Sequence, residues 1–111
     1  MAYDETLAER IRAIWVGRSD FTERKMFGGI AFLSAGRMVV GVLNTSLVAR
    51  VGKPNYDESL SRPHVREMDF NGRPMQGYVY VDAAGVRTVR QLRFWLDRCE
   101  AFVATLPPKR S

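Results

Sequence analysis

Three short apolar segments, joined by turns too short to hold a helix, are the feature that most constrains the fold. "GIAFL" begins at Gly29, "MVVGVL" at Met38 and "LVARV" at Leu47, and "SAGR" and "NTS" connect them. Parallel strands need a crossover of about a dozen residues or more. Gly36 supplies the positive φ that a tight hairpin turn requires. The segments therefore predict three antiparallel strands that follow one another as a meander.

Two adjacent glycines precede the first of these segments, in "KMFGGIAF". A glycine-rich phosphate loop joins a strand to a helix, whose free N–H groups then point at the phosphate. Here a predicted helix ends near Gly17 and a strand follows Gly29, and the lysine comes before the glycines. We therefore predict a bend or bulge, with Gly28 or Gly29 in a conformation that other residues avoid, and no nucleotide cofactor.

Two segments have the spacing of amphipathic helices. The first runs from Asp4 to Val16, with acidic residues at its start and Gly17 just beyond its end. The second begins at Thr88, and Gln91 three residues later has the spacing of a capping box. We expect both apolar stripes to pack against one sheet. The stripes are Leu7, Ile11, Ile14 and Trp15 in the first helix, and Leu92, Trp95, Leu96, Cys99, Phe102, Val103 and Leu106 in the second.

The chain between the meander and the second long helix predicts further strands. "NYDESLS" has room for only a short helix, and "REMDFNGRPMQGYVYVD" is extended in pattern. Asn71 and Gly72 form a strong turn signal, and Pro74 belongs at the start of a strand or on an edge. The order of elements indicates an α+β fold, an antiparallel sheet flanked by N- and C-terminal helices. We expect one domain over residues 1–111.

The composition of the 111 residues limits the class of protein. The net charge is +5, with basic residues spread along the chain. Cys99 is the only cysteine, so neither an intramolecular disulfide nor a Cys-rich zinc site can form. No apolar run approaches the ~20 residues that span a bilayer. These features predict a cytoplasmic protein with no membrane partner.

Residues that could support catalysis form no recognisable motif. His64 is the only histidine and lies in a polar connection without a nucleophile motif nearby, so we expect a surface side chain. Cys99 lies on the apolar stripe of the second long helix, where a cysteine behaves as a core residue. Four carboxylates lack the spacing of an EF-hand and a set of histidines: Asp57, Glu58, Glu67 and Asp69. We therefore predict no enzyme, and no catalytic, cofactor or metal residues.

One group of charges opposes a local rule. Arg87, Arg90 and Arg93 crowd the start of the second long helix, where the helix dipole favours negative charge. Guanidinium groups beside free helix N–H groups suit an anion. The three residues are the candidate anion or partner patch, and the alternative is a solvated helix face.

A second basic arrangement involves aromatic residues. Tyr78 and Tyr80 share one face of a predicted strand, and Arg73 is near them in sequence. Such a pattern can mark a single-stranded nucleic-acid platform, but the chain has no RRM-like aromatic motif. We expect these tyrosines to be buried or covered by a helix.

With these motifs placed, the chain resembles the N-terminal domain family of the TfoX/Sxy competence regulators. The resemblance rests on "MAYDETLAERIR", "KMFGGIAF", "LVARVG", "MDFNGRPMQGYVYVD" and "AFVATLPPK" in that order. It implies an α+β fold with a central antiparallel sheet flanked by helices. The residues that carry it are mainly fold-forming types: Lys25, Met26, Phe27, Gly28, Gly29, Gly72, Pro74, Met75 and Gly77.

The resemblance also implies a non-enzymatic role in the transcriptional control of DNA-uptake genes. We therefore expect a regulatory or adaptor domain that acts through protein contacts, with a second copy of the chain as one candidate partner. The alternative is a small basic module that binds nucleic acid, which we do not favour because the charges are spread along the chain.

Overall fold

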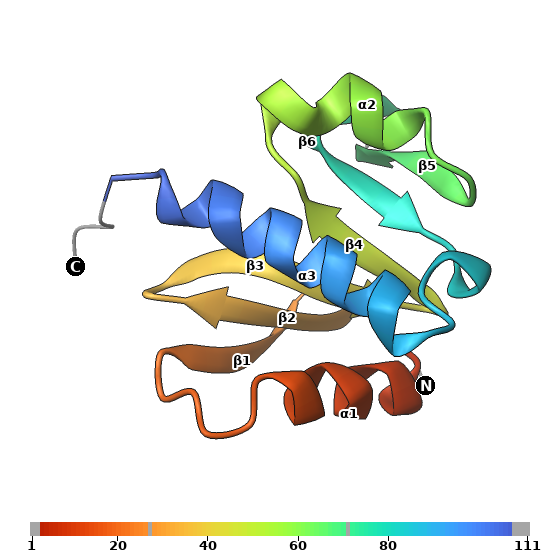
Figure 1. Ribbon diagram of the computed structural model, residues 1–111. Helices are drawn as coiled ribbons and strands as arrows, with labels where there is room; N and C mark the ends of the chain where they lie inside the picture. Colours follow the sequence, from red (N-terminus) through yellow and green to blue (C-terminus); the bar gives the residue numbers. More distant parts are fainter. Residues whose placement is uncertain (1–2, 27, 71, 108–111) are drawn as a thin grey trace.

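A computed structural model describes residues 3–26, 28–70 and 72–107. Its centre is one antiparallel sheet with the strand order β1-β2-β3-β4-β6-β5, which confirms the predicted α+β class (Figure 1). The strands are β1 (Phe21–Met26), β2 (Gly29–Ser34), β3 (Arg37–Leu43), β4 (Ser46–Arg50), β5 (Val65–Phe70) and β6 (Arg73–Val81).

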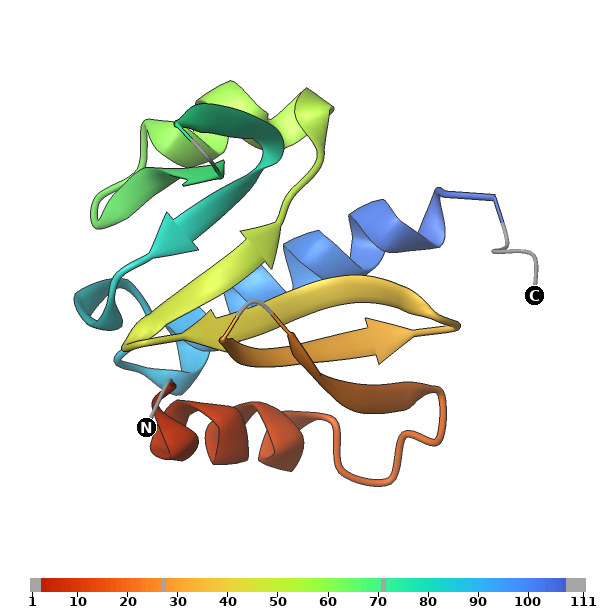
Figure 2. The same cartoon turned by 180° about the vertical axis from the view of Figure 1, so that it is seen from behind.

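The first helix and the first strand form one unit at the edge of the sheet. Helix α1 (Glu5–Ile14) begins where the Asp4 carboxylate accepts hydrogen bonds from two backbone N–H groups, and Gly17, at φ +83°, follows its end. Trp15 stacks on Phe21 of β1 with 3.8 Å between the ring centroids. These contacts place α1 beside β1 in both views of the molecule (Figures 1 and 2).

Strand β1 corrects the expected position of the glycine pair. The sequence predicted a helix before the pair and the first strand after it, but strand β1 precedes the pair, and Met26 of β1 pairs with Gly29 of β2. The pair therefore belongs to a hairpin connection. Gly28 has φ +78°, so the predicted unusual backbone conformation is confirmed for this glycine. Phe27, one of the residues that carry the family resemblance, lies outside the described residues.

The meander itself forms as predicted. Strands β2, β3 and β4 pair antiparallel in sequence, and a bulge interrupts the β2–β3 register. Ala35 and Gly36 have positive φ angles of 53° and 82° in the first turn, and Asn44 has 53° in the second. These are the left-handed conformations that tight hairpin turns use.

The last two strands do not follow their chain order in the sheet, since β6 lies between β4 and β5. Gly72 has φ +78° in their connection, while Asn71 lies outside the described residues. Pro74 is the second residue of β6, and β4 pairs with β6 only from Tyr78 onward. The proline therefore lies where β6 has a single neighbouring strand, as the loss of its N–H requires.

Helix α3 (Val89–Ala104) crosses one face of the sheet, in front of the strands in Figure 1 and behind them in Figure 2. Its buried residues pack with those of α1 and with the inward side chains of the strands. The short α2 (Tyr56–Leu60) packs on β5 and β6. Of the eleven stripe residues expected in the core, Ile14, Phe102 and Leu106 are half-buried. The other eight are buried: Leu7, Ile11, Trp15, Leu92, Trp95, Leu96, Cys99 and Val103.

Candidate functional site

The start of α3 presents the predicted arginines to solvent. Thr88 Oγ1 accepts a hydrogen bond from the Gln91 backbone at 3.1 Å, and Gln91 Oε1 accepts one from the Thr88 backbone at 2.9 Å. This capping box fixes the first turn, which contains no acidic residue. Arg87, Arg90 and Arg93 are all exposed around it. The apolar side chain of Val89 in the same turn is 60% exposed.

The three arginines of this patch have no acidic partner among the described residues. Among the described residues, the side chains of Arg87, Arg90 and Arg93 make no hydrogen bond or ion pair. Arg10 of α1 adds a further guanidinium, because its Nη2 donates to the Arg87 carbonyl at 3.1 Å. The arginines that do pair with carboxylates are Arg12, Arg18, Arg62, Arg66 and Arg98.

A pocket of about 240 Å³ opens beside this turn. Arg90 lines it together with Arg62 and His64 from the connection between α2 and β5, and with Phe94 and Trp95 of α3. We call it the α3-start pocket. The structure thus brings Arg90 together with two basic side chains from another part of the chain. Arg87 and Arg93 are not part of the pocket wall.

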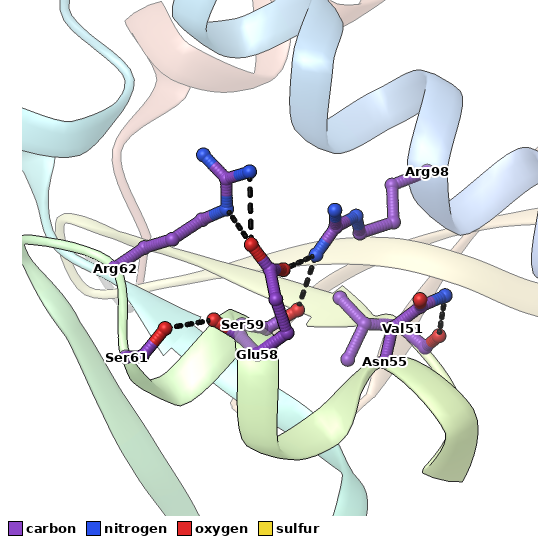
Figure 3. Close-up of polar contacts among 7 residues, drawn as sticks. All are labelled: Val51, Asn55, Glu58, Ser59, Ser61, Arg62 and Arg98. Atoms are coloured by element: carbon purple, nitrogen blue, oxygen red, sulfur yellow. Dashed lines mark hydrogen bonds and ion pairs between the residues drawn. The ribbon is translucent and has the colours of Figure 1, made fainter.

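Two arginines and one glutamate connect α2 and its following turn to α3 (Figure 3), and one of them, Arg62, also lines the pocket. Glu58 accepts hydrogen bonds from Arg98 and from Arg62, whose Nε lies 3.0 Å from the carboxylate. Both guanidinium groups lie over the Phe94 ring, 4.2 Å from its centroid for Arg62 and 4.7 Å for Arg98. Arg98 also donates to the buried Ser59 hydroxyl at 2.9 Å. Glu58 thereby neutralises part of the positive charge beside the pocket.

The same contacts change the pKa of the Glu58 carboxyl group. Hydrogen bonds from Arg98 and then Arg62 hold the pKa of Glu58 below its ordinary value, because both stabilise the ionised carboxylate. Glu58 therefore stays charged in mildly acidic solution and keeps the two guanidinium groups oriented. We call Glu58, Arg62, Phe94 and Arg98 the α2–α3 clamp.

His64 is exposed, as the sequence predicted, but its backbone is unusual. Its φ is +67°, a left-handed conformation that few non-glycine residues adopt. The His64 carbonyl accepts a hydrogen bond from the Asp82 N–H at 2.8 Å, which holds the turn in place beside the end of β6. This backbone conformation places the imidazole in the wall of the α3-start pocket.

The clamp and the pocket wall were not predicted from the sequence. Glu58 and Arg98 are 40 positions apart, so only the fold brings them together. A local signal did exist for one contact, because Glu58 and Arg62 have the i, i+4 spacing of a helical ion pair. Nothing in the sequence pattern indicates that Phe94 lies beneath both arginines.

The tyrosines of β6 correct another expectation. Val79 and Val81 point into the core. Tyr80 alternates with them and points to the opposite face of the sheet, whereas Tyr78 lines a pocket together with Phe102 of α3. Both tyrosines are half-buried rather than fully buried. A guanidinium lies over each ring, that of Arg50 over Tyr78 and that of Arg66 over Tyr80.

The remaining features to consider are the single thiol, groups of metal-ligating side chains and membrane-spanning helices. Cys99 is fully buried, and desolvation raises the pKa of its thiol far above the ordinary value. A thiol in that state is a poor nucleophile. Within the described ranges, no three His, Cys, Asp or Glu side chains gather closely enough to hold a metal ion. No helix of the described chain is long and apolar enough to cross a bilayer.

Comparison with known proteins identifies one relationship. The profile of the TfoX N-terminal domain family matches residues 16–103, which is most of the chain. This match agrees with the six-stranded antiparallel sheet and its two flanking helices. No curated protein and no solved structure matches the chain.

Proposed function

The chain belongs to the TfoX N-terminal domain family, and we propose that it is a non-enzymatic regulatory or adaptor domain of the cytoplasm that acts through protein contacts. The observation that carries this proposal is the group of unpaired arginines around an exposed valine at the start of α3. Transcriptional control of DNA-uptake genes is the regulatory role that we propose for it.

The patch suits an acidic segment of a partner protein. Guanidinium groups recognise carboxylates through paired, charge-assisted hydrogen bonds. Val89 offers an apolar contact between Arg87 and Arg90, and protein interfaces combine such apolar contacts with polar rims. The α3-start pocket beside Arg90 could receive one side chain of that segment. A second copy of the chain is one candidate partner.

Charge reversal tests this proposal. The test variant is Arg90→Glu/Arg93→Glu, and the control is Arg24→Glu/Arg73→Glu, which changes the net charge equally at two other exposed, unpaired arginines. Each full chain is immobilised and exposed to native bacterial lysate over a series of salt concentrations. Captured proteins are quantified by mass spectrometry, and self-association is measured by analytical ultracentrifugation.

We expect at least one protein, or a second copy of the chain, to bind the wild type and the control but not the patch variant. Binding should weaken with rising salt, since exposed charges are screened. Identical capture and self-association for all three chains would refute a role for the patch in protein contacts.

A nucleic-acid-binding module is a second candidate, favoured by the two tyrosines of β6 that each lie under a guanidinium, Tyr78 under Arg50 and Tyr80 under Arg66. Fluorescence anisotropy with a single-stranded and a duplex oligonucleotide tests it. Affinity that falls steeply with salt and is lost in a Tyr78→Ala/Tyr80→Ala variant would support this candidate. Absence of binding at low salt would exclude it.

A further inference from the structure

A second cavity lies near the other end of α3. Its volume is about 360 Å³, and the end of β4, the short 3₁₀ turn at Lys53–Asn55, the middle of β6 and Phe102 of α3 surround it. We call it the α3-end pocket. It is separate from the α3-start pocket, since the two share no lining residue.

The pocket has a backbone surface that only glycines allow. Gly52 has φ +85°, and a Cβ at this position would come within 2.3 Å of the Phe102 ring. Gly77 has φ +95°, and its carbonyl accepts a hydrogen bond from the Gly52 N–H at 3.0 Å. The two glycines therefore lie against each other with no side chain between them. The absence of a side chain at Gly52 lets the Phe102 ring lie directly against the backbone at the wall of the pocket.

The basic residues of this pocket have no counterion in the part of the chain that the structure describes. Arg50 is half-buried, and its Nη1 donates to the Met38 carbonyl at 3.2 Å. Within the described chain, Nε and Nη2 of Arg50 have no hydrogen-bond partner, and Lys53 makes no ion pair. None of the pocket residues is acidic. The α2–α3 clamp differs, because there the guanidinium groups of Arg62 and Arg98 donate to the Glu58 carboxylate.

Aromatic rings flank the unpaired guanidinium. The Arg50 Cζ atom lies 5.6 Å from the centroid of Tyr78 and 5.9 Å from that of Phe102. These contacts and the bond to Met38 hold the guanidinium in one place before any ligand arrives. A donor that is already oriented loses little entropy when it binds, which favours affinity.

We propose that the α3-end pocket binds a small aromatic anion, a carboxylate or phosphate attached to one or two flat rings. The ring packs against Phe102, Tyr78 and the glycine backbone, and the anionic group accepts hydrogen bonds from Arg50 and Lys53. The cavity volume is at the lower end of the ~300–1,000 Å³ that ligand pockets span, so the ligand is a small molecule. This site is independent of the protein contacts proposed for the start of α3.

Nuclear magnetic resonance titration of the full ¹⁵N-labelled chain tests the proposal. The anionic probes are indole-3-acetate and phenyl phosphate, which separate a carboxylate ligand from a phosphate ligand, and indole-3-acetamide is the neutral match for the first. The variants are Arg50→Met and Lys53→Met. Arg66→Met is the control, because Arg66 stacks on the neighbouring Tyr80 but does not line the pocket.

We expect saturable shifts of the Gly52, Lys53 and Gly77 amides with at least one anionic probe. Loss of a hydrogen bond to a charged group should weaken affinity ~10-fold or more in Arg50→Met and for the neutral probe. Lys53→Met should weaken it less, and Arg66→Met should leave it unchanged. Lys53 is exposed, so its variant keeps the test valid if Arg50→Met fails to fold.

Three results would overturn the proposal. The first is equal affinity for indole-3-acetate and indole-3-acetamide. The second is a set of shifts centred on His64 and Arg90 instead of the glycines. The third is the absence of saturable shifts with both anionic probes at their solubility limits.

Discussion

The two ends of α3 hold basic, aromatic pockets that treat their charge in opposite ways. Beside the α3-start pocket, Arg62 and Arg98 share the carboxylate of Glu58 above the ring of Phe94. Near the end of the helix, Arg50 contacts two aromatic rings and forms no ion pair with any carboxylate of the described residues. The first arrangement holds two helices together. The second leaves its charge for a ligand.

The difference shows that the number of arginines in a region does not identify a binding site. Both regions are rich in arginine and aromatic residues, and both lie on the same helix. What separates them is whether the protein supplies the anion. A guanidinium that is already paired gains little from an external carboxylate, because it must first give up the internal one. Of the arginines beside the two pockets, the unpaired Arg50 and Arg90 therefore gain more from an external anion than Arg62 and Arg98 do.

The largest expected effect on stability comes from a core residue of α3 that lies between the two pockets. Leu96 is fully buried midway along α3. Leu96→Ala should lower the free energy of unfolding by about 2–5 kcal/mol, because it removes buried methyl groups and leaves a cavity. Urea denaturation followed by tryptophan fluorescence measures this loss. A change below about 1 kcal/mol would mean that the helix is not the common support of the two pockets.

The helices and their caps could be predicted because their signals are local. The spacing of Leu92, Leu96 and Cys99 indicates a buried stripe, and Thr88 with Gln91 indicates the cap. Strand β1 was missed because "FTERKM" is a polar edge strand that alternates too little to reveal itself. Its position depends on distant contacts, such as the ion pair between Arg12 and Glu23 at 2.6 Å.

The candidate sites were predictable only in part. The patch at Arg87, Arg90 and Arg93 follows from sequence because its residues are neighbours on one helix. Neither pocket does, because each is built from segments that the fold brings together. The insertion of β6 between β4 and β5 places Gly77 against Gly52, and no local pattern specifies that strand order.

Gly52 offers the next largest effect and tests the shape of the α3-end pocket. Gly52→Ala combines a positive φ with a methyl group against the Phe102 ring, and should cost about 2–3 kcal/mol. Gly17→Ala is the matched control, since Gly17 has φ +83° with nothing within 4 Å of the added Cβ. It should cost ~1 kcal/mol. Equal losses in urea denaturation would show that the contact with Phe102 does not matter.

The α2–α3 clamp should make the stability of the protein depend on pH. The pKa of Glu58 in the folded protein lies below its ordinary value of 4.5, first because of Arg98 and then because of Arg62. The folded state is therefore stabilised above pH 4.5, and that stabilisation disappears as pH falls through the lowered pKa. Glu58→Gln should be less stable than the wild type near neutral pH and should lose less stability on acidification.

Urea midpoints measured from about pH 7 to about pH 3 give this comparison. Glu9→Gln is the control, since Glu9 is exposed and makes no ion pair among the described residues. Its stability should run parallel to that of the wild type over the whole range. If Glu58→Gln also runs parallel, the clamp contributes nothing to the pH dependence and the contrast between the two pockets loses its electrostatic basis.

The smallest effect compares the two ends of α3 directly by placing the same residue at each. The helix dipole favours a negative charge in the first turn and disfavours one in the last. Arg90→Glu should therefore stabilise the protein by about 0.3–1 kcal/mol, whereas Ala101→Glu, at an exposed position in the last turn, should destabilise it by a similar amount.

Arg90→Gln and Ala101→Gln separate the charge from the change in side-chain shape. Thermal denaturation at low and high salt measures the four variants, and both charge effects should shrink as salt rises. If Arg90→Glu destabilises the fold at low salt, then Arg90 takes part in a stabilising contact, and the patch at the start of α3 is structural rather than available to a partner.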